Sequence, residues 1–180
     1  MFFMLLMVVA TMGAAVNASA QNPMVGGAAM YSTKDIVDNT VNSADHTTLV
    51  AAVKAAGLVD TLKGAGPFTV FAPTNAAFDK LPAGTVDMLV KPENQAMLSK
   101  LLTYHVIAGR MDSNAIMKAI RKGGGTAHLK TVSGGNLTAM MSGKSLVLRD
   151  EKGGTSMVTI ANVRQSNGVI HVVDTVLMPR

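Results

Sequence analysis

The hydrophobic positions of this chain follow two periods, and the change of period separates a helical part from a strand-rich part. Leu49, Val53 and Ala56 recur at the i, i+4, i+7 spacing that places apolar side chains on one helical face. Beyond residue 126, apolar and polar residues alternate, as on strands with one buried face. The predicted helices cover residues 33–41, 47–56, 58–62, 83–90, 92–102 and 114–122, and the predicted strands cover 127–132, 137–141, 145–149, 157–163 and 169–177.

Turn-forming pairs separate the predicted strands. Gly134-Gly135 and Gly153-Gly154 stand between apolar runs, and Asn167-Gly168 is the pair most typical of a two-residue hairpin. Helices in the first part and strands in the last part favour an α+β fold with an antiparallel sheet over alternating βαβ units.

The run from Gly66 to Pro82 contains the highest density of local secondary-structure signals in the chain. Gly66-Pro67 ends the preceding segment, and Phe68–Phe71 reads as a short buried strand. Pro73 is expected to stop that strand, and Thr74 to cap a short helix on which Phe78 faces inward. The strand at 68–71 and the last strand are both apolar enough to be central, which predicts a non-local pairing between them.

The N-terminus has the composition of an export leader. Phe2 to Val16 is almost wholly apolar, and Ala18-Ser19-Ala20 fits a signal-peptidase site before Gln21. The lysine or arginine that usually opens a leader is missing, which favours a leader whose first residues precede Met1. The alternative is an uncleaved anchor, but the run is shorter than the roughly 20 residues a span needs. We therefore predict a signal peptide at 1–20, a linker at 21–32, one domain at 33–180, and a secreted or periplasmic protein without a stable membrane anchor after cleavage.

The amino-acid composition and the charge distribution exclude several kinds of site and partner. The chain has no cysteine, which excludes disulfides, thiolate metal sites and a cysteine nucleophile. Residues 34–99 carry five basic and seven acidic side chains, whereas residues 100–180 carry eleven basic and four acidic ones. A basic half favours anionic partners, but two tyrosines and no tryptophan leave no stacking platform, so we predict no nucleic-acid partner.

Three motifs resemble those of the fasciclin domain family. Gly66-Pro-Phe-Thr-Val-Phe-Ala-Pro-Thr-Asn-x-Ala-Phe78 is similar to its first motif block, Leu102-Thr-Tyr104-His105-Val106 to its tyrosine–histidine motif, and 167–179 to its C-terminal block. The motifs occur in the family's order across residues 33–180. The resemblance implies an α+β fold, a wedge-shaped β-sandwich with several helices packed along one side.

The same resemblance implies roles for particular residues. Fasciclin domains occur in extracellular adhesion proteins and secreted bacterial antigens, and no common catalytic activity is attached to them. Tyr104 and His105 match a segment linked to integrin binding in some animal members. The positions that match the structural motifs are Phe68, Phe71, Pro73, Thr74, Asn75, Phe78, His171 and Asp174.

The residues themselves give little support for catalysis or metal binding. No two of the four histidines are spaced as local metal ligands, and there is no Gly-x-Ser-x-Gly elbow. His105 and His171 are read as core or edge histidines bonded to backbone, with ligand binding as the alternative. His171 and Asp174 point to opposite faces if the strand is regular. We predict no enzyme, no metal site and no cofactor.

The best candidate for a binding patch is Lys118, Arg121 and Lys122 on one predicted helix. They are neighbours at i+3 and i+4, which suits either an anion-binding surface or an ordinary solvated face. The leading hypothesis is a monomeric adhesion or surface-interaction module for an extracellular or cell-envelope protein or polysaccharide. The alternative is a periplasmic carrier of a small ligand or metal that uses His105, His171 or an apolar crevice.

Overall fold

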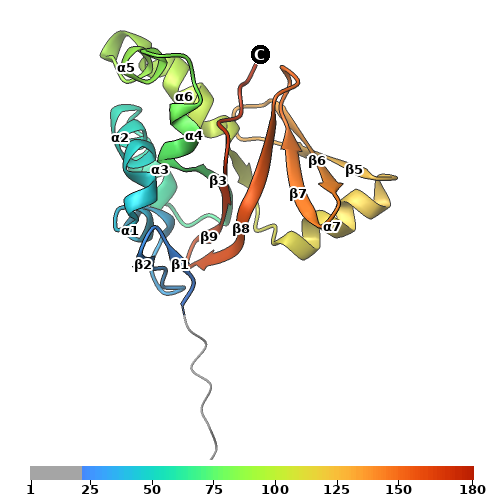
Figure 1. Cartoon of the computed structure of the whole chain (residues 1–180). Coiled ribbons are helices and arrows are strands. Elements are labelled where there is room, and N and C mark those ends of the chain that lie inside the picture. The colour runs from blue at the N-terminus through green and yellow to red at the C-terminus, as the bar shows by residue number, and fades with distance from the viewer. Residues whose placement is uncertain (1–21) are drawn as a thin grey trace, which may run out of the picture.

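A single seven-stranded sheet organises the chain, with its strands in the order β4-β3-β9-β8-β7-β6-β5. The computed structural model describes residues 22–180 (Figure 1). A separate two-stranded hairpin precedes the sheet. The strands are β1 (Met24–Val25), β2 (Ala28–Ala29), β3 (Phe68–Pro73), β4 (Val106–Ala108), β5 (Thr126–Lys130), β6 (Asn136–Ser142), β7 (Ser145–Arg149), β8 (Thr155–Gln165) and β9 (Gly168–Val173).

The helices form two unequal groups around the sheet. In Figure 1, α1 to α6 gather on one side of β3 and β9, and α7 lies beside β5–β7 at the other end. Most are short, because proline and glycine punctuate the first half of the chain. The helices are α1 (Ile36–Thr40), α2 (Thr47–Ala55), α3 (Val59–Lys63), α4 (Asn75–Asp79), α5 (Thr85–Leu89), α6 (Gln95–Tyr104) and α7 (Ser113–Lys122), with 3₁₀ turns η1 (Ala44–His46) and η2 (Pro92–Asn94).

The neighbouring strands β3 and β9 are parallel, which corrects the expectation of an antiparallel sheet. Phe71 lies beside His171 in this register, and Phe68 beside Gly168. The other pairings of the seven-stranded sheet are antiparallel. The predicted pairing of the early strand β3 with the final strand β9 is confirmed. Whether the two strands run parallel or antiparallel depends on the long connection between them, and the sequence pattern of either strand does not determine it.

Alternate side chains of β3 serve two hydrophobic cores. Val70 and Ala72 face the core beneath α1–α6. Phe71, between them, faces a second core that α7 and the inner sides of β5–β7 complete. This is the period-two geometry of a strand buried on both faces. The predicted wedge-shaped sandwich with helices along one side is therefore confirmed.

The capping predictions for the motif around β3 hold. The Thr74 hydroxyl accepts a hydrogen bond from the Ala77 amide at 3.2 Å, as a helix N-cap does. Phe78 on that helix is buried, as predicted. Pro73 is the last residue of β3 and keeps its place in register with β9, so it closes the strand from within.

Two short pieces of sheet were not predicted. Residues 21–32 were expected to be a linker, but β1 and β2 lie there, and Val25 and Met30 are buried in the first core. The edge strand β4 lies just beyond the predicted helix at 92–102, in a segment to which no strand was assigned. The predicted signal peptide at 1–20 lies outside the described residues. Within residues 22–180, no helix is long and apolar enough to cross a membrane.

Candidate interaction surface

Tyr104 lies at the end of α6 with its side chain inside the protein. Its hydroxyl donates to the Asn136 carbonyl at 2.8 Å and accepts from the Glu151 amide at 3.1 Å. Gly135 packs so closely that a Cβ there would lie 2.7 Å from the Tyr104 ring. Burial raises the pKa of the Tyr104 hydroxyl to about 12, so this group stays protonated. Tyr104 thus holds the β5–β6 turn and the turn after β7 against the end of α6.

His105 follows as the C-cap of α6 and is also buried. Its Nδ1 lies 2.9 Å from the Leu101 carbonyl, and its Nε2 accepts from the Leu177 amide at 3.0 Å. These partners require a neutral ring with the proton on Nδ1. Burial lowers the pKa of His105 to about 4, which agrees with that state. Both ring nitrogens are therefore engaged with backbone.

His171 sits in the middle of β9 and stacks on Phe71, with ring centroids 5.6 Å apart. Its Nε2 lies 2.9 Å from the Met111 carbonyl, and burial lowers its pKa. Asp174, just past the strand, accepts from the Met157 amide at 2.8 Å. Burial opposes ionisation of Asp174, but this bond and its neighbours lower its pKa overall. The two residues thus have separate backbone partners and show no acid–base pairing.

Asn75 connects its own helix to another. Its Oδ1 accepts from the Thr48 amide at 3.0 Å, and its Nδ2 donates to the Ala44 carbonyl at 2.8 Å. It therefore holds the start of α2 against α4, which packs Phe78 beside it. Phe68, at the start of β3, is only half-buried and lies at the edge of the first core.

Asn167 has a role that sequence reasoning missed. The Asn-Gly pair was recognised as the turn between β8 and β9. The Asn167 side chain also accepts from the Ile36 amide at 3.1 Å and donates to the Leu62 carbonyl at 2.7 Å. One buried amide therefore joins the start of α1, the end of α3 and the sheet. The only sequence signal was the turn itself, which does not indicate such distant partners.

Lys118, Arg121 and Lys122 are exposed on α7, and we call them the α7 cluster. The apolar side of this helix, with Ile116 and Ile120, packs into the second core. The cluster therefore points away from the protein body. Asp112 caps the helix at its other end, where its carboxylate accepts from the Ala115 amide at 2.8 Å.

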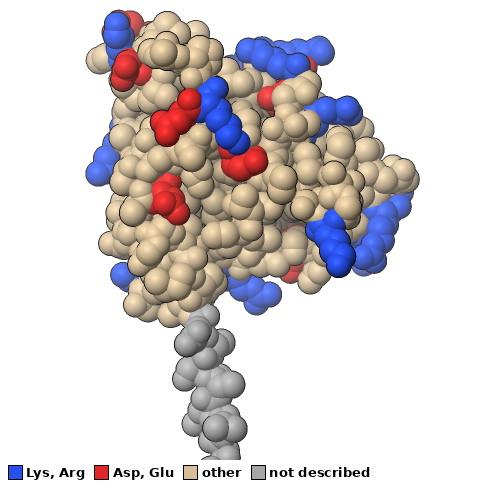
Figure 2. All heavy atoms as spheres, viewed as in Figure 1, with Lys and Arg blue, Asp and Glu red and all other residues tan. Residues whose placement is uncertain are grey.

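The two acidic residues in the turn after β7 already have backbone partners. Asp150 accepts from backbone amides at both Gly154 and Met178, and Glu151 from Asn136. Among residues 22–180, the ion pairs involve only Lys63 and Lys80 as cations. On the face drawn in Figure 2, basic side chains surround the region of β5–β7 and α7, and acidic ones lie mostly over the helices. The β5–β7 end thus presents unpaired positive charge.

The structure does not bring the predicted site residues together. Tyr104 and His105 are buried, whereas the α7 cluster is exposed on a different element. Within the described part of the chain, no group of three or more histidine, aspartate or glutamate side chains could hold a metal ion. What the described residues offer is the exposed charged surface of the α7 cluster.

The fold and these motif contacts define a fasciclin-type domain, and comparisons with known proteins agree. The fasciclin domain family model matches residues 44–179, and the chain belongs to this family. A solved FAS1 domain pair from the insect cell adhesion molecule Fasciclin I superposes with a TM-score of 0.72 at 17% identity, over 81% of this chain. This chain spans about half of that solved chain, 51%.

Bacterial relatives are much closer in sequence. Protein sll1483 of Synechocystis is 41% identical over 161 residues, which cover 88% of this chain and 81% of the relative. The cell surface glycolipoprotein MPB83 of Mycobacterium bovis is 37% identical over 89% of this chain and 68% of its own length. The immunogenic protein MPB70 of the same species is 39% identical over 77% of this chain and 65% of its own length. One of these relatives thus carries a cell-surface name.

Proposed function

We propose that this chain is an exported fasciclin-domain protein that acts as a cell-adhesion or surface-interaction module, without catalysis. The observation that carries the proposal is the unpaired positive charge of the α7 cluster on a fasciclin domain. The cell-surface name of one relative and the leader-like N-terminus support export to the periplasm or beyond.

The partner that fits this surface is an acidic polymer of the cell envelope or matrix, such as an anionic polysaccharide. Exposed cations attract such a polymer through long-range charge, and the apolar face of α7 holds them in fixed positions on the core. Lysine and arginine next to one another on a helix repel slightly, by about 0.2–0.5 kcal/mol per pair. A bound polyanion would relieve that repulsion.

Retention of the purified protein on polygalacturonate beads, with neutral dextran beads as reference, tests the proposal. We expect retention at low salt and release toward 1 M salt, where the screening length falls to about 3 Å. The variant Lys118→Gln, Arg121→Gln, Lys122→Gln should pass through while keeping its melting temperature.

The matched control removes the same charge from the helical side, as Lys34→Gln, Lys91→Gln, Lys100→Gln. It should bind almost as the unchanged protein does. An equal loss of retention in both variants would show that retention depends only on net charge. If the unchanged protein is not retained at any salt concentration, the proposal is contradicted.

A further inference from the structure

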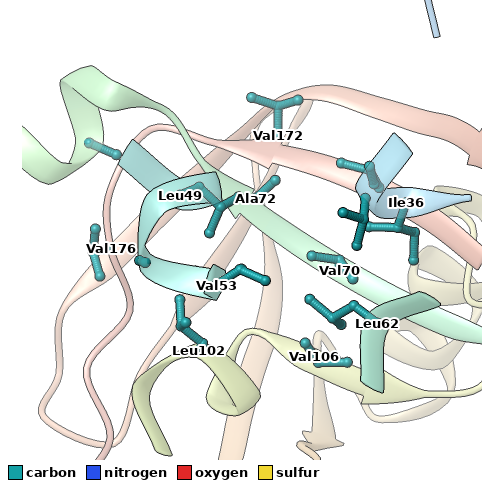
Figure 3. Packing of buried hydrophobic residues seen from close by; sticks show 14 of the residues in the cluster. Ile36, Leu49, Val53, Leu62, Val70, Ala72, Leu102, Val106, Val172 and Val176 are labelled. Carbon is teal, nitrogen blue, oxygen red and sulfur yellow. The ribbon is translucent and has the colours of Figure 1, made fainter. Parts of the chain in front are cut away.

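The first hydrophobic core contains an open apolar cleft of about 60 Å³. It lies between the helices α1–α3 and the sheet edge formed by β3 and β4. Figure 3 shows Val53, Leu62, Val70, Leu102 and Val106 converging on this region from different elements. These side chains lie on short helices and strands, whose directions are set by caps and turns. The valine and leucine side chains on these elements leave part of the space between the helices and the sheet unfilled.

The interior of the cleft suits an apolar group. Its wall is almost wholly carbon, and a concave site with an apolar lining of this kind suits a hydrocarbon group. His105 contributes to the wall, but both of its nitrogens are already bonded to Leu101 and Leu177. The one histidine in the wall thus offers a ligand no free polar atom.

The cleft opens at the surface. Val50, Leu58, Val59 and Phe68 in its wall are half-buried, and Val132 is 47% exposed. At 60 Å³ the cleft is smaller than the roughly 150 Å³ cavity that encloses a benzene molecule. A ligand would therefore place only its apolar end inside and extend past this rim.

Lys54 provides a charge at the rim. It lies in the last turn of α2, is exposed, and is the only charged residue in the wall. Within residues 22–180, the recorded hydrogen bonds and ion pairs of lysine side chains involve Lys63, Lys80 and Lys100, but not Lys54. An ammonium beside an apolar opening is complementary to an anionic head on an apolar tail.

We propose that this cleft binds an anionic amphiphile of the fatty-acid class. The end of the alkyl chain occupies the space between Val53, Leu62 and Val70, and the carboxylate lies against the Lys54 ammonium. The site is separate from the α7 cluster, so it does not depend on the proposed adhesion function.

Titration of the protein with decanoate below its micelle concentration, followed by methyl NMR, tests the site. We expect saturable shifts in the methyl groups of Val53, Leu62, Val70 and Val106, and little change in the exposed Val41. Lys54→Gln should weaken decanoate binding about threefold to fivefold, as expected for an exposed charge pair. Its effect on uncharged decanol should be much smaller. Lys91→Gln is the matched control and should leave decanoate binding unchanged.

A variant that fills the cleft gives a second readout. Val53→Phe should abolish the methyl shifts while the far-UV circular dichroism and cooperative melting are kept. If that variant does not fold, the Lys54→Gln comparison still decides. Shifts that are absent, unsaturable or spread over the surface would overturn the proposal, as would equal effects of Lys54→Gln on decanoate and decanol.

Discussion

At the scale of single residues, the family motifs turn out to act through buried contacts. Tyr104, His105, Asn167 and His171 each bind backbone groups of other elements. Leaving such a backbone group buried without its partner costs about 1–3 kcal/mol. The motifs identify the fold because those contacts hold its parts in register, and the surface that we propose for partner binding lies on other residues.

Phe71 gives the sharpest residue-scale prediction. It is fully buried, fills the second core and stacks on His171. Phe71→Ala should lower the free energy of unfolding by about 3–5 kcal/mol, through lost burial and the cavity left behind. Urea unfolding measures this. Met97→Ala, at a position 57% exposed, should change it by less than about 0.5 kcal/mol. A Phe71→Ala protein that unfolds at the original urea concentration would contradict this placement.

At the scale of elements, local pattern predicted the second half of the chain better than the first. The strand at 145–149 was predicted with its observed ends, because glycine-containing turns flank a clear alternation of buried and exposed residues. The strands β1 and β2 are two residues long each, and β4 is three residues long. Segments that short have no measurable period, and only pairing in the folded protein defines them.

The candidate sites differ in how far sequence could predict them. The α7 cluster follows from helical spacing within one element, so the residues alone suggested it. The cleft draws its wall from α1, α2, α3, β3, α6, β4 and β9. Its existence depends on how closely these elements approach, which no single segment records. The sequence suggested only that an apolar crevice was one alternative.

The capping of α7 provides a prediction at this scale. Asp112→Ala removes the oxygen that accepts from the Ala115 amide and should cost about 0.5–2 kcal/mol. Hydrogen exchange of the first α7 amides should speed up along with the lower urea midpoint. Asp112→Asn keeps a capping oxygen and should retain most of the stability. Equal losses in the two variants would show that the cap is not the cause.

At the scale of the whole molecule, neutral histidines lie inside the fold on both sides of β3 and β9. His46 contacts Ser43 at the base of α2, His105 ends α6, and His171 lies on β9. Burial lowers the pKa of all three. The cores were therefore assembled around rings that must stay uncharged, and this couples the stability of the domain to acid.

This coupling predicts a loss of stability on mild acidification. In the unfolded chain histidine takes up a proton near pH 6.5, whereas His105 in the folded protein does so only near pH 4. Between these values the unfolded state binds more protons, so the free energy of unfolding falls as pH falls. His105 alone should account for about 2 kcal/mol between pH 7 and pH 5. The stabilisation that comes from the neutral His105 ring is fully present above about pH 6.5. It is lost as pH falls toward 4 and does not change further below about pH 4.

Urea unfolding at pH 7, 6, 5 and 4 measures the effect, and two variants locate it. His105→Gln should remove the His105 part of the dependence between pH 6.5 and pH 4, because glutamine does not titrate, and should leave the part due to His46 and His171. Met97→Ala, at an exposed position without a titratable group, should leave the dependence as it was. Below pH 4 a further loss is expected as Asp174, whose pKa is lowered in the fold, takes up its proton. A free energy of unfolding that is the same at pH 7 and pH 5 would mean that these rings can accept protons inside the fold.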